Sequence, residues 1–122
     1  MLFDIDWFKH VNDTHGHDAG DRVLKELADV VKSVIRSTDT FGRWGGEEFL
    51  IICPETSLET GKAAGEKVRK AVKDHIFSHD LRITISMGIT VYTGEKSLQE
   101  MLLEADRRMY RAKEQGRDLV VV

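Results

Sequence analysis

The stretch Gly-Arg-Trp-Gly-Gly-Glu-Glu-Phe at residues 42–49 decides the fold that this sequence predicts. It contains the junction, at Gly45-Gly46, of two strand candidates at residues 38–44 and 48–53. Gly45 and Gly46 supply the positive-φ freedom that a tight turn between antiparallel strands requires. They also let a bulky phosphate ligand approach the backbone, because they carry no side chain. The segment therefore predicts a β-hairpin with an open tip.

Two acidic clusters are expected to converge near this tip. Glu47 and Glu48 follow the glycine pair, and Asp4 and Asp6 lie at the end of an apolar strand candidate at residues 1–5. Carboxylate oxygens are hard ligands of the kind that Mg²⁺ prefers, and the glycines leave room for phosphates beside them. The sequence therefore predicts a site for Mg²⁺ and nucleotide phosphates where the strand end and the hairpin meet.

Helical and strand patterns alternate along the rest of the chain. A helical turn is expected at residues 7–12, then a loop containing Gly16 and Gly20, and Ser57 is a plausible helix N-cap. Apolar spacing predicts helices at 20–36, 58–76 and 97–114, and strands at 82–91 and 119–122. The expected order is β-α-β-β-α-β-α-β, and its first six elements match a ferredoxin-like, split βαβ α/β unit. We expect one mainly antiparallel sheet with the helices on one face.

Composition excludes several classes of protein. The 122 residues fit one domain, at residues 1–122, and 41% hydrophobic with 32% charged residues is typical of an ordered globular chain. A net charge of −3 argues against DNA or RNA as a partner. No apolar run is long enough to span a membrane, so no membrane contact is expected from this segment. No export signal is visible. The single Cys53 is expected to be a small buried thiol. A cytoplasmic location fits best, although upstream segments could anchor a longer parent protein.

Three separated motifs occur in an order that resembles the GGDEF family, the bacterial diguanylate cyclases. They are FDIDWFKHVNDTHGHDAGD at 3–21, RWGGEEF at 43–49, and a D-x-x-x-Y-x-A-K-x-x-G-R pattern at 106–117. The resemblance extends over the whole chain. The family's N-terminal helix and its D-x-L-T-G-L-x-N-R stretch would lie upstream of residue 1. We therefore expect residues 1–122 to be a GGDEF domain that lacks that helix.

The resemblance implies a polymerase-palm-like fold and the condensation of two GTP molecules into cyclic di-GMP, with release of pyrophosphate. It implies Mg²⁺ or Mn²⁺ as cofactor, with Asp4, Glu47 and the Ile5 carbonyl oxygen as metal ligands. Glu48 could assist a second metal or the proton transfer. The resemblance does not separate the roles of the two glutamates. For Asp6, a role in capping the short helix or in the structure and a role in catalysis are equally open.

The resemblance also assigns substrate contacts. Lys9, Lys113 and Arg117 match residues that contact the triphosphate, and Lys9 also counts among the catalytic residues. Considered alone, the last two would be ordinary surface charges at a helix end. Asn12 and Asp21 match the residues that read guanine, because a carboxylate and an amide complement its N1–H and N2–H₂ edge. The substrate-binding set is thus Lys9, Asn12, Asp21, Gly45, Gly46, Lys113 and Arg117.

A regulatory site is implied by Arg36-Ser-Thr-Asp39, an R-x-x-D motif upstream of the hairpin. In the family this motif binds the product cyclic di-GMP and inhibits the enzyme, so Arg36 and Asp39 form the expected inhibitory site. Arg69 could assist it, although Lys67 and Arg69 are more simply solvated helix charges.

Oligomeric state follows from the implied reaction. Each chain should hold one GTP, so turnover needs a homodimer, and an isolated chain could be monomeric and slow. The alternative function is a catalytically silent module that senses GTP or cyclic di-GMP.

Overall fold

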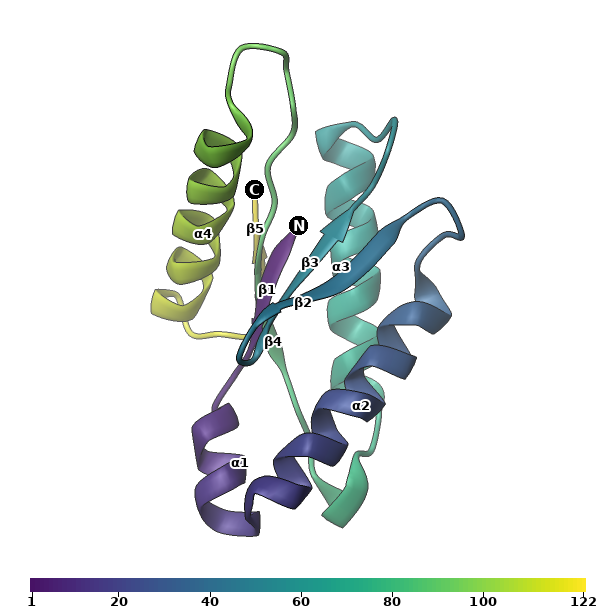
Figure 1. Cartoon of the computed structure of the whole chain (residues 1–122), viewed down its shortest axis with the longest axis vertical. Helices are drawn as coiled ribbons and strands as arrows, with labels where there is room; N and C mark the ends of the chain where they lie inside the picture. The colour runs from purple at the N-terminus through teal and green to yellow at the C-terminus, as the bar shows by residue number, and fades with distance from the viewer.

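The hairpin expected at residues 42–49 is present at one edge of a five-stranded sheet in this computed structural model, which describes residues 1–122 (Figure 1). The strand order is β2-β3-β1-β4-β5, so the first strand of the chain is central. Neighbouring strands are antiparallel except β4 and β5, which confirms the mainly antiparallel sheet. The strands are β1 (Leu2–Ile5), β2 (Thr40–Gly45), β3 (Glu48–Ile52), β4 (Ile85–Gly88) and β5 (Leu119–Val121).

Four α-helices and one 3₁₀ turn connect the strands. The Ser57 hydroxyl oxygen accepts the Thr60 backbone N–H at 3.2 Å and caps α3, as the sequence predicts. Ser97 and Glu100 form a reciprocal capping box at the start of α4. The helices are α1 (Phe8–His15), α2 (His17–Val34), α3 (Leu58–Asp74), η1 (Ser78–Asp80) and α4 (Leu98–Glu114).

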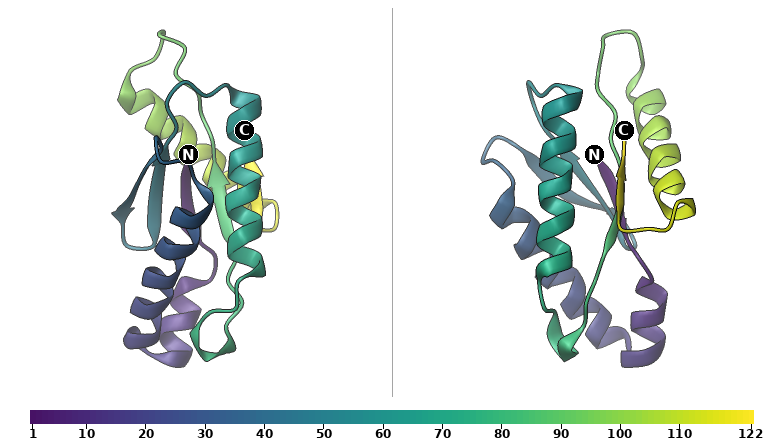
Figure 2. Two further views of the ribbon diagram at one scale, coloured as in Figure 1. Left: turned by 90° about the vertical axis from the view of Figure 1, so that its right-hand side faces the viewer. Right: turned by 180° about the vertical axis from the view of Figure 1, so that it is seen from behind.

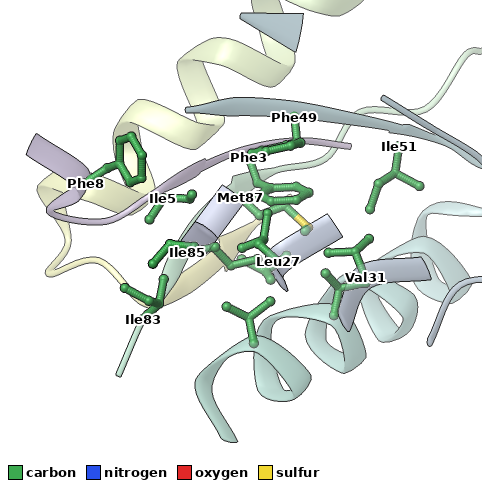
Figure 3. Close-up of a cluster of buried hydrophobic side chains, with 14 of the residues drawn as sticks. Phe3, Ile5, Phe8, Leu27, Val31, Phe49, Ile51, Ile83, Ile85 and Met87 are labelled. Carbon is green, nitrogen blue, oxygen red and sulfur yellow. The ribbon is translucent and has the colours of Figure 1, made fainter. Parts of the chain in front are cut away.

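The helices cover both faces of the sheet (Figure 2). Phe3 and Ile5 belong to the main apolar core, which β1 shares with α2 and α3 (Figure 3). Leu2 lies on the alternate face of the same strand and packs with Ala105 and Met109 of α4. The expectation of helices on one face is therefore wrong. Side chains of β1 alternate between two apolar surfaces, and each surface needs a covering helix.

Close packing brings α4 onto the sheet. A Cβ atom placed at Gly88 would lie 2.0 Å from the Ala105 carbonyl oxygen, so only glycine fits at this position of β4. The close approach matters for function, because the last turn of α4 carries Lys113 toward the end of β1.

Some predicted boundaries differ from the structure. The helix predicted at 20–36 begins at His17, so Gly20 lies inside α2 rather than in a loop. The strand predicted at 82–91 pairs only over Ile85–Gly88, because the neighbouring strands β1 and β5 are short. Cys53 is half-buried rather than fully buried, since β3 ends before it.

Candidate active site

The acidic ends of β1 and β3 lie side by side. Asp4 is the register partner of Glu48 in the antiparallel ladder, and the Ile5 backbone N–H donates to the Glu47 carbonyl oxygen at 3.3 Å. From α4, on the other side, the Lys113 ammonium donates to Asp4 Oδ2 at 2.7 Å. The strand pairing thus brings together carboxylates that are more than forty residues apart in the chain.

Negative charge in this cluster is only partly compensated. The Asp4 residue is 5% exposed, and its Oδ1 atom is buried without any hydrogen-bond partner. Burial raises the pKa of Asp4, and the hydrogen bond and charge of Lys113 offset this only in part. Burial, followed by repulsion from Asp4, also raises the pKa of Glu47 and of Glu48. The negative charge of these three carboxylates is therefore not fully compensated by neighbouring cations.

A divalent cation would compensate this negative charge. The orphan Asp4 Oδ1 is a hard acceptor, and Glu47 and Glu48 are close enough to Asp4 for its charge to raise their pKa values. No group of three or more His, Cys, Asp or Glu side chains is gathered in a geometry that could hold an ion by itself. Backbone and ligand oxygens would therefore have to complete the coordination, as is usual for Mg²⁺ bound together with nucleotide phosphates.

The hairpin tip beside these carboxylates is open. Gly46 has φ of 51°, and the Arg43 guanidinium donates to its carbonyl oxygen at 2.6 Å, which fixes the turn. A Cβ atom placed at Gly45 or Gly46 would meet nothing within 4 Å. A ligand can therefore reach the backbone at the tip.

The three cations expected to bind phosphate come from two neighbouring segments. Lys113, in the last turn of α4, contacts Asp4 directly, and Arg117 lies in the turn that follows α4. The Arg117 guanidinium carbon is 3.9 Å from the centroid of the exposed Trp7 ring, a cation–π contact. Lys9 is exposed in the first turn of α1, two residues after Trp7.

The two residues expected to read guanine lie where α1 packs on α2. The Asn12 Oδ1 atom is buried and has no hydrogen-bond partner. A Cβ atom at Gly20 would lie 1.8 Å from that oxygen, so any other residue there would displace the Asn12 amide. Asp21 is the next residue and is exposed. The unpaired amide oxygen of Asn12 thus lies against Gly20, the chain neighbour of the exposed Asp21.

Asp6 does not cap the short helix. Trp7 occupies the N-cap position of α1, and no side chain makes a capping hydrogen bond there. Asp6 instead accepts hydrogen bonds from the hydroxyl groups of Thr84 and Ser86 and from the backbone N–H of Asp118. No local pattern indicates this network, because its members are 78 to 112 residues apart from Asp6 in the chain.

Arg36 and Asp39 lie at the opposite end of β2 from the hairpin tip (Figure 1). The Arg36 guanidinium donates to Asp39 Oδ1 at 3.1 Å and to the Thr56 hydroxyl at 2.6 Å. A cavity of about 270 Å³ adjoins this pair and is lined by Lys67 among others. Arg69 points elsewhere, to Glu66 and to Asp118 near the end of α4, so the expectation that Arg69 assists this site is wrong. Lys67 is the basic residue of α3 that lies beside it.

None of the helices is both long and apolar enough to cross a bilayer.

Comparison with known proteins identifies relatives that match over almost the whole chain. Residues 1–119 match the family described as "Diguanylate cyclase, GGDEF domain". Diguanylate cyclase A of Treponema denticola is 39% identical over 100% of this chain and 34% of its own length. Response regulator PleD of Caulobacter vibrioides is 42% identical over 99% of this chain and 28% of its own length. The chain therefore spans about a third of these relatives.

Solved structures share the fold. The active GGEEF domain of a diguanylate cyclase from Vibrio cholerae has a TM-score of 0.91 and 35% identity, covering 98% of this chain and 78% of that one. The GGDEF domain of DgcB from Caulobacter crescentus, in complex with c-di-GMP, has a TM-score of 0.91 and 32% identity, covering 98% and 74%. These likenesses confirm the predicted α/β fold.

Proposed function

This chain belongs to the GGDEF family of diguanylate cyclases, and we propose that it condenses two GTP molecules into cyclic di-GMP, releasing two pyrophosphates. The observation that carries the proposal is the buried, unpartnered Asp4 Oδ1 beside Glu47 and Glu48. Strand pairing makes these residues neighbours, but the packing of the sheet does not require their side chains to be acidic. A GTP-dependent reaction places the domain in the cytoplasm.

Metal binding is assigned to the ends of β1 and β3. Asp4, Glu47 and the Ile5 carbonyl oxygen would hold Mg²⁺ or Mn²⁺, with Glu48 available to a second ion. The bound ion would act as a Lewis acid toward phosphate oxygens and as a template for the nucleotide. Lys113, which pairs with Asp4, would be free to contact phosphate once a cation satisfies Asp4.

The reaction joins two nucleotides. The 3′-oxygen of one GTP forms a bond to the α-phosphorus of the other, and the bond between that phosphorus and the oxygen bridging to the β-phosphate breaks. The second 3′-oxygen attacks the remaining α-phosphorus in the same way, which closes the ring and releases the second pyrophosphate. We assign the proton of the 3′-hydroxyl to Glu48, which is the register partner of Asp4. Lys9, Lys113 and Arg117 bind the triphosphate and stabilise the charge on the leaving pyrophosphate.

Specificity for guanine is assigned to Asn12 and Asp21. The Asp21 carboxylate would accept the N1–H and N2–H₂ donors of guanine, and Asn12 would complete the contact. Adenine presents an acceptor at N1, so it would leave the carboxylate unpaired and repelled.

Two further features follow from the same assignment. One chain binds one GTP, so two chains must face each other as a homodimer for the attack. Cyclic di-GMP, which the Caulobacter crescentus DgcB domain binds, would inhibit by binding Arg36 and Asp39.

The test is product analysis of the chain with GTP and Mg²⁺, both alone and fused to a parallel dimeric coiled coil. We expect cyclic di-GMP from the fusion, and much slower formation from the dilute single chain. GTP binding without product from the fusion would overturn the cyclase proposal and favour a silent sensor. Equal rates per chain at all dilutions would overturn the homodimer requirement.

A further inference from the structure

Asp6 is a buried carboxylate that the proposed chemistry does not use. Its hydrogen bonds connect the end of β1 to β4 and to the turn after α4, close to the cations proposed to bind phosphate. Asp6 is 4% exposed. Its Oδ1 accepts the Ser86 hydroxyl at 2.6 Å, and its Oδ2 accepts the Thr84 hydroxyl at 2.7 Å and the Asp118 backbone N–H at 3.0 Å. Both oxygens of Asp6 therefore have partners, whereas one oxygen of Asp4, Oδ1, has none. Asp6 is built to hold other groups rather than to bind a cation.

The turn that Asp6 contacts has an unfavourable backbone conformation. Arg117 and Asp118 have φ values of 66° and 48°, in the left-handed region. This conformation costs about 1 kcal/mol for each residue other than glycine. The Arg117 N–H donates to the Ala112 carbonyl oxygen at 3.0 Å, and the Asp118 N–H donates to Asp6. Removing Asp6 would free one of these two donors and let the turn relax.

The side chain of Asp118 holds the same turn from a third direction. Its carboxylate accepts hydrogen bonds from Arg69 at 2.7 Å and from Lys73 at 2.6 Å, both on α3. Partial burial by itself would raise the pKa of Asp118, but these two cations more than offset it and hold the pKa below its ordinary value. The turn is thus tied to β1, α3 and α4 together.

The residue placed by these contacts is Arg117. Its guanidinium stacks on Trp7, which directly follows Asp6 and also has a positive φ, 59°. Asp6 is therefore linked to both members of the stack. It directly precedes Trp7 in the chain, and it accepts a hydrogen bond from Asp118, which directly follows Arg117. A stacked guanidinium keeps its N–H groups directed outward in one plane, which suits a phosphate.

We propose that Asp6, acting through Asp118, is a positioning residue that holds Arg117 over Trp7 in the orientation that binds the nucleotide triphosphate. This inference rests on the proposed function. An arginine that is already ordered loses less conformational entropy when it binds. Affinity for the triphosphate should therefore depend on Asp6, whereas affinity for the guanine base should not.

The first test needs no ligand. In the free protein the ring current of Trp7 should shift the NMR resonance of Arg117 Hε upfield, and Trp7→Leu should abolish that shift. Asp6→Ala should move the resonance most of the way to the Trp7→Leu value. The matched control Ser86→Ala, which removes another hydrogen bond to Asp6, should leave it in place. An unchanged Hε shift in folded Asp6→Ala would overturn the proposal.

The second test measures binding of a non-hydrolysable GTP analogue and of guanosine by calorimetry. Asp6→Ala should weaken the analogue about fivefold, leave guanosine unchanged, and have less than about a 1.5-fold effect when Arg117→Ala is already present. Asp6→Asn, which keeps an acceptor oxygen, should restore most of the affinity. Additive losses from Asp6→Ala and Arg117→Ala would show that Asp6 acts on general stability and would overturn the proposal.

Two controls keep the outcomes distinct. If Asp6→Ala does not fold, Asp6→Ser takes its place, because its shorter side chain withdraws the carboxylate acceptor from the Asp118 backbone N–H and keeps a polar group beside Thr84 and Ser86. A preserved Arg117 shift in that variant would overturn the proposal. If the wild-type chain binds neither GTP analogue nor guanosine, the proposed function fails, and the NMR test still decides whether Asp6 positions Arg117.

Discussion

The two ends of the β2-β3 hairpin handle charge in opposite ways. At the tip, Asp4 keeps a buried oxygen without a partner, and the pKa values of the surrounding carboxylates are raised. At the other end, the side chain of Asp39 is 4% exposed and is held by Arg36, whose backbone and side-chain hydrogen bonds outweigh burial and lower the Asp39 pKa. The carboxylates at the tip are therefore only partly balanced by Lys113, whereas Asp39 at the other end is paired with Arg36.

This difference indicates how each end would respond to a ligand. A cation that binds at the tip relieves repulsion, so part of its binding free energy comes from the protein's own unfavourable charge. A ligand at Arg36 must compete with Asp39 and Thr56 for the guanidinium. The six residues of β2 separate the ends by about 20 Å, at roughly 3.3 Å per residue. Substitutions can therefore test each end separately.

The largest effect is expected from Glu47→Ala, which removes a proposed metal ligand. Turnover of the dimeric form should fall by at least about 100-fold, since even groups that only support a ligand contribute up to that much. Steady-state product formation at saturating Mg²⁺ measures it, with Glu95→Ala, an exposed carboxylate in a loop, as the matched control. Turnover near the wild-type rate would remove Glu47 from the metal site.

An intermediate effect is expected from Arg36→Ala at the opposite end. The concentration of cyclic di-GMP that inhibits by half should rise about tenfold or more, because charge-assisted hydrogen bonds are lost. The KM for GTP should not change. Arg82→Ala, an exposed arginine that donates only to the Asp74 carbonyl oxygen, is the matched control. Inhibition that is unchanged in Arg36→Ala would make this motif an ordinary helix end.

Features of the fold that depend on residues close together in the chain could be predicted from the sequence, and features that depend on distant residues could not. The Gly45-Gly46 turn and the strand pattern predicted the hairpin, and strand pairing then placed Asp4 opposite Glu48. The partners of Asp6 could not be predicted, because three segments far apart in the chain supply them. The position of α4 on the second face also had no local signal.

Arg36 and Trp7 show a second limit. The R-x-x-D motif was visible in the sequence, but the pairing of Arg36 with its own aspartate depends on the turn after α2. The positive φ of Trp7 and its stack with Arg117 depend on contacts between the two ends of the chain. Motifs thus identified candidate residues, and the fold determined which of their charges are already satisfied.

The smallest effect is a contrast in sign between two neutralising substitutions in metal-free protein. Glu47→Gln should stabilise the domain by about 0.5 kcal/mol after allowance for solvent screening, or about 2 °C in Tm. Asp39→Asn should destabilise it, because Arg36 loses its partner. Thermal unfolding at neutral pH measures both. Destabilisation by both substitutions would contradict the contrast between the two ends.

The dependence on pH has a defined sign at each end. A raised pKa in the folded state means that lowering the pH from neutral relieves repulsion at Asp4, Glu47 and Glu48, which favours folding. The lowered pKa of Asp39 acts in the opposite direction, and its stabilising contribution is lost as the pH falls through that pKa. Glu47→Gln should therefore reduce the gain in Tm on mild acidification.

The most direct test of the central claim is paramagnetic broadening of backbone amide resonances by substoichiometric Mn²⁺. The unsatisfied carboxylates predict that signals of residues 4–6 and 47–48 broaden first, while those of residues 36–39 stay sharp. Broadening that begins elsewhere, or that affects the two ends equally, would contradict the claim that the ends of β1 and β3 form the cation site.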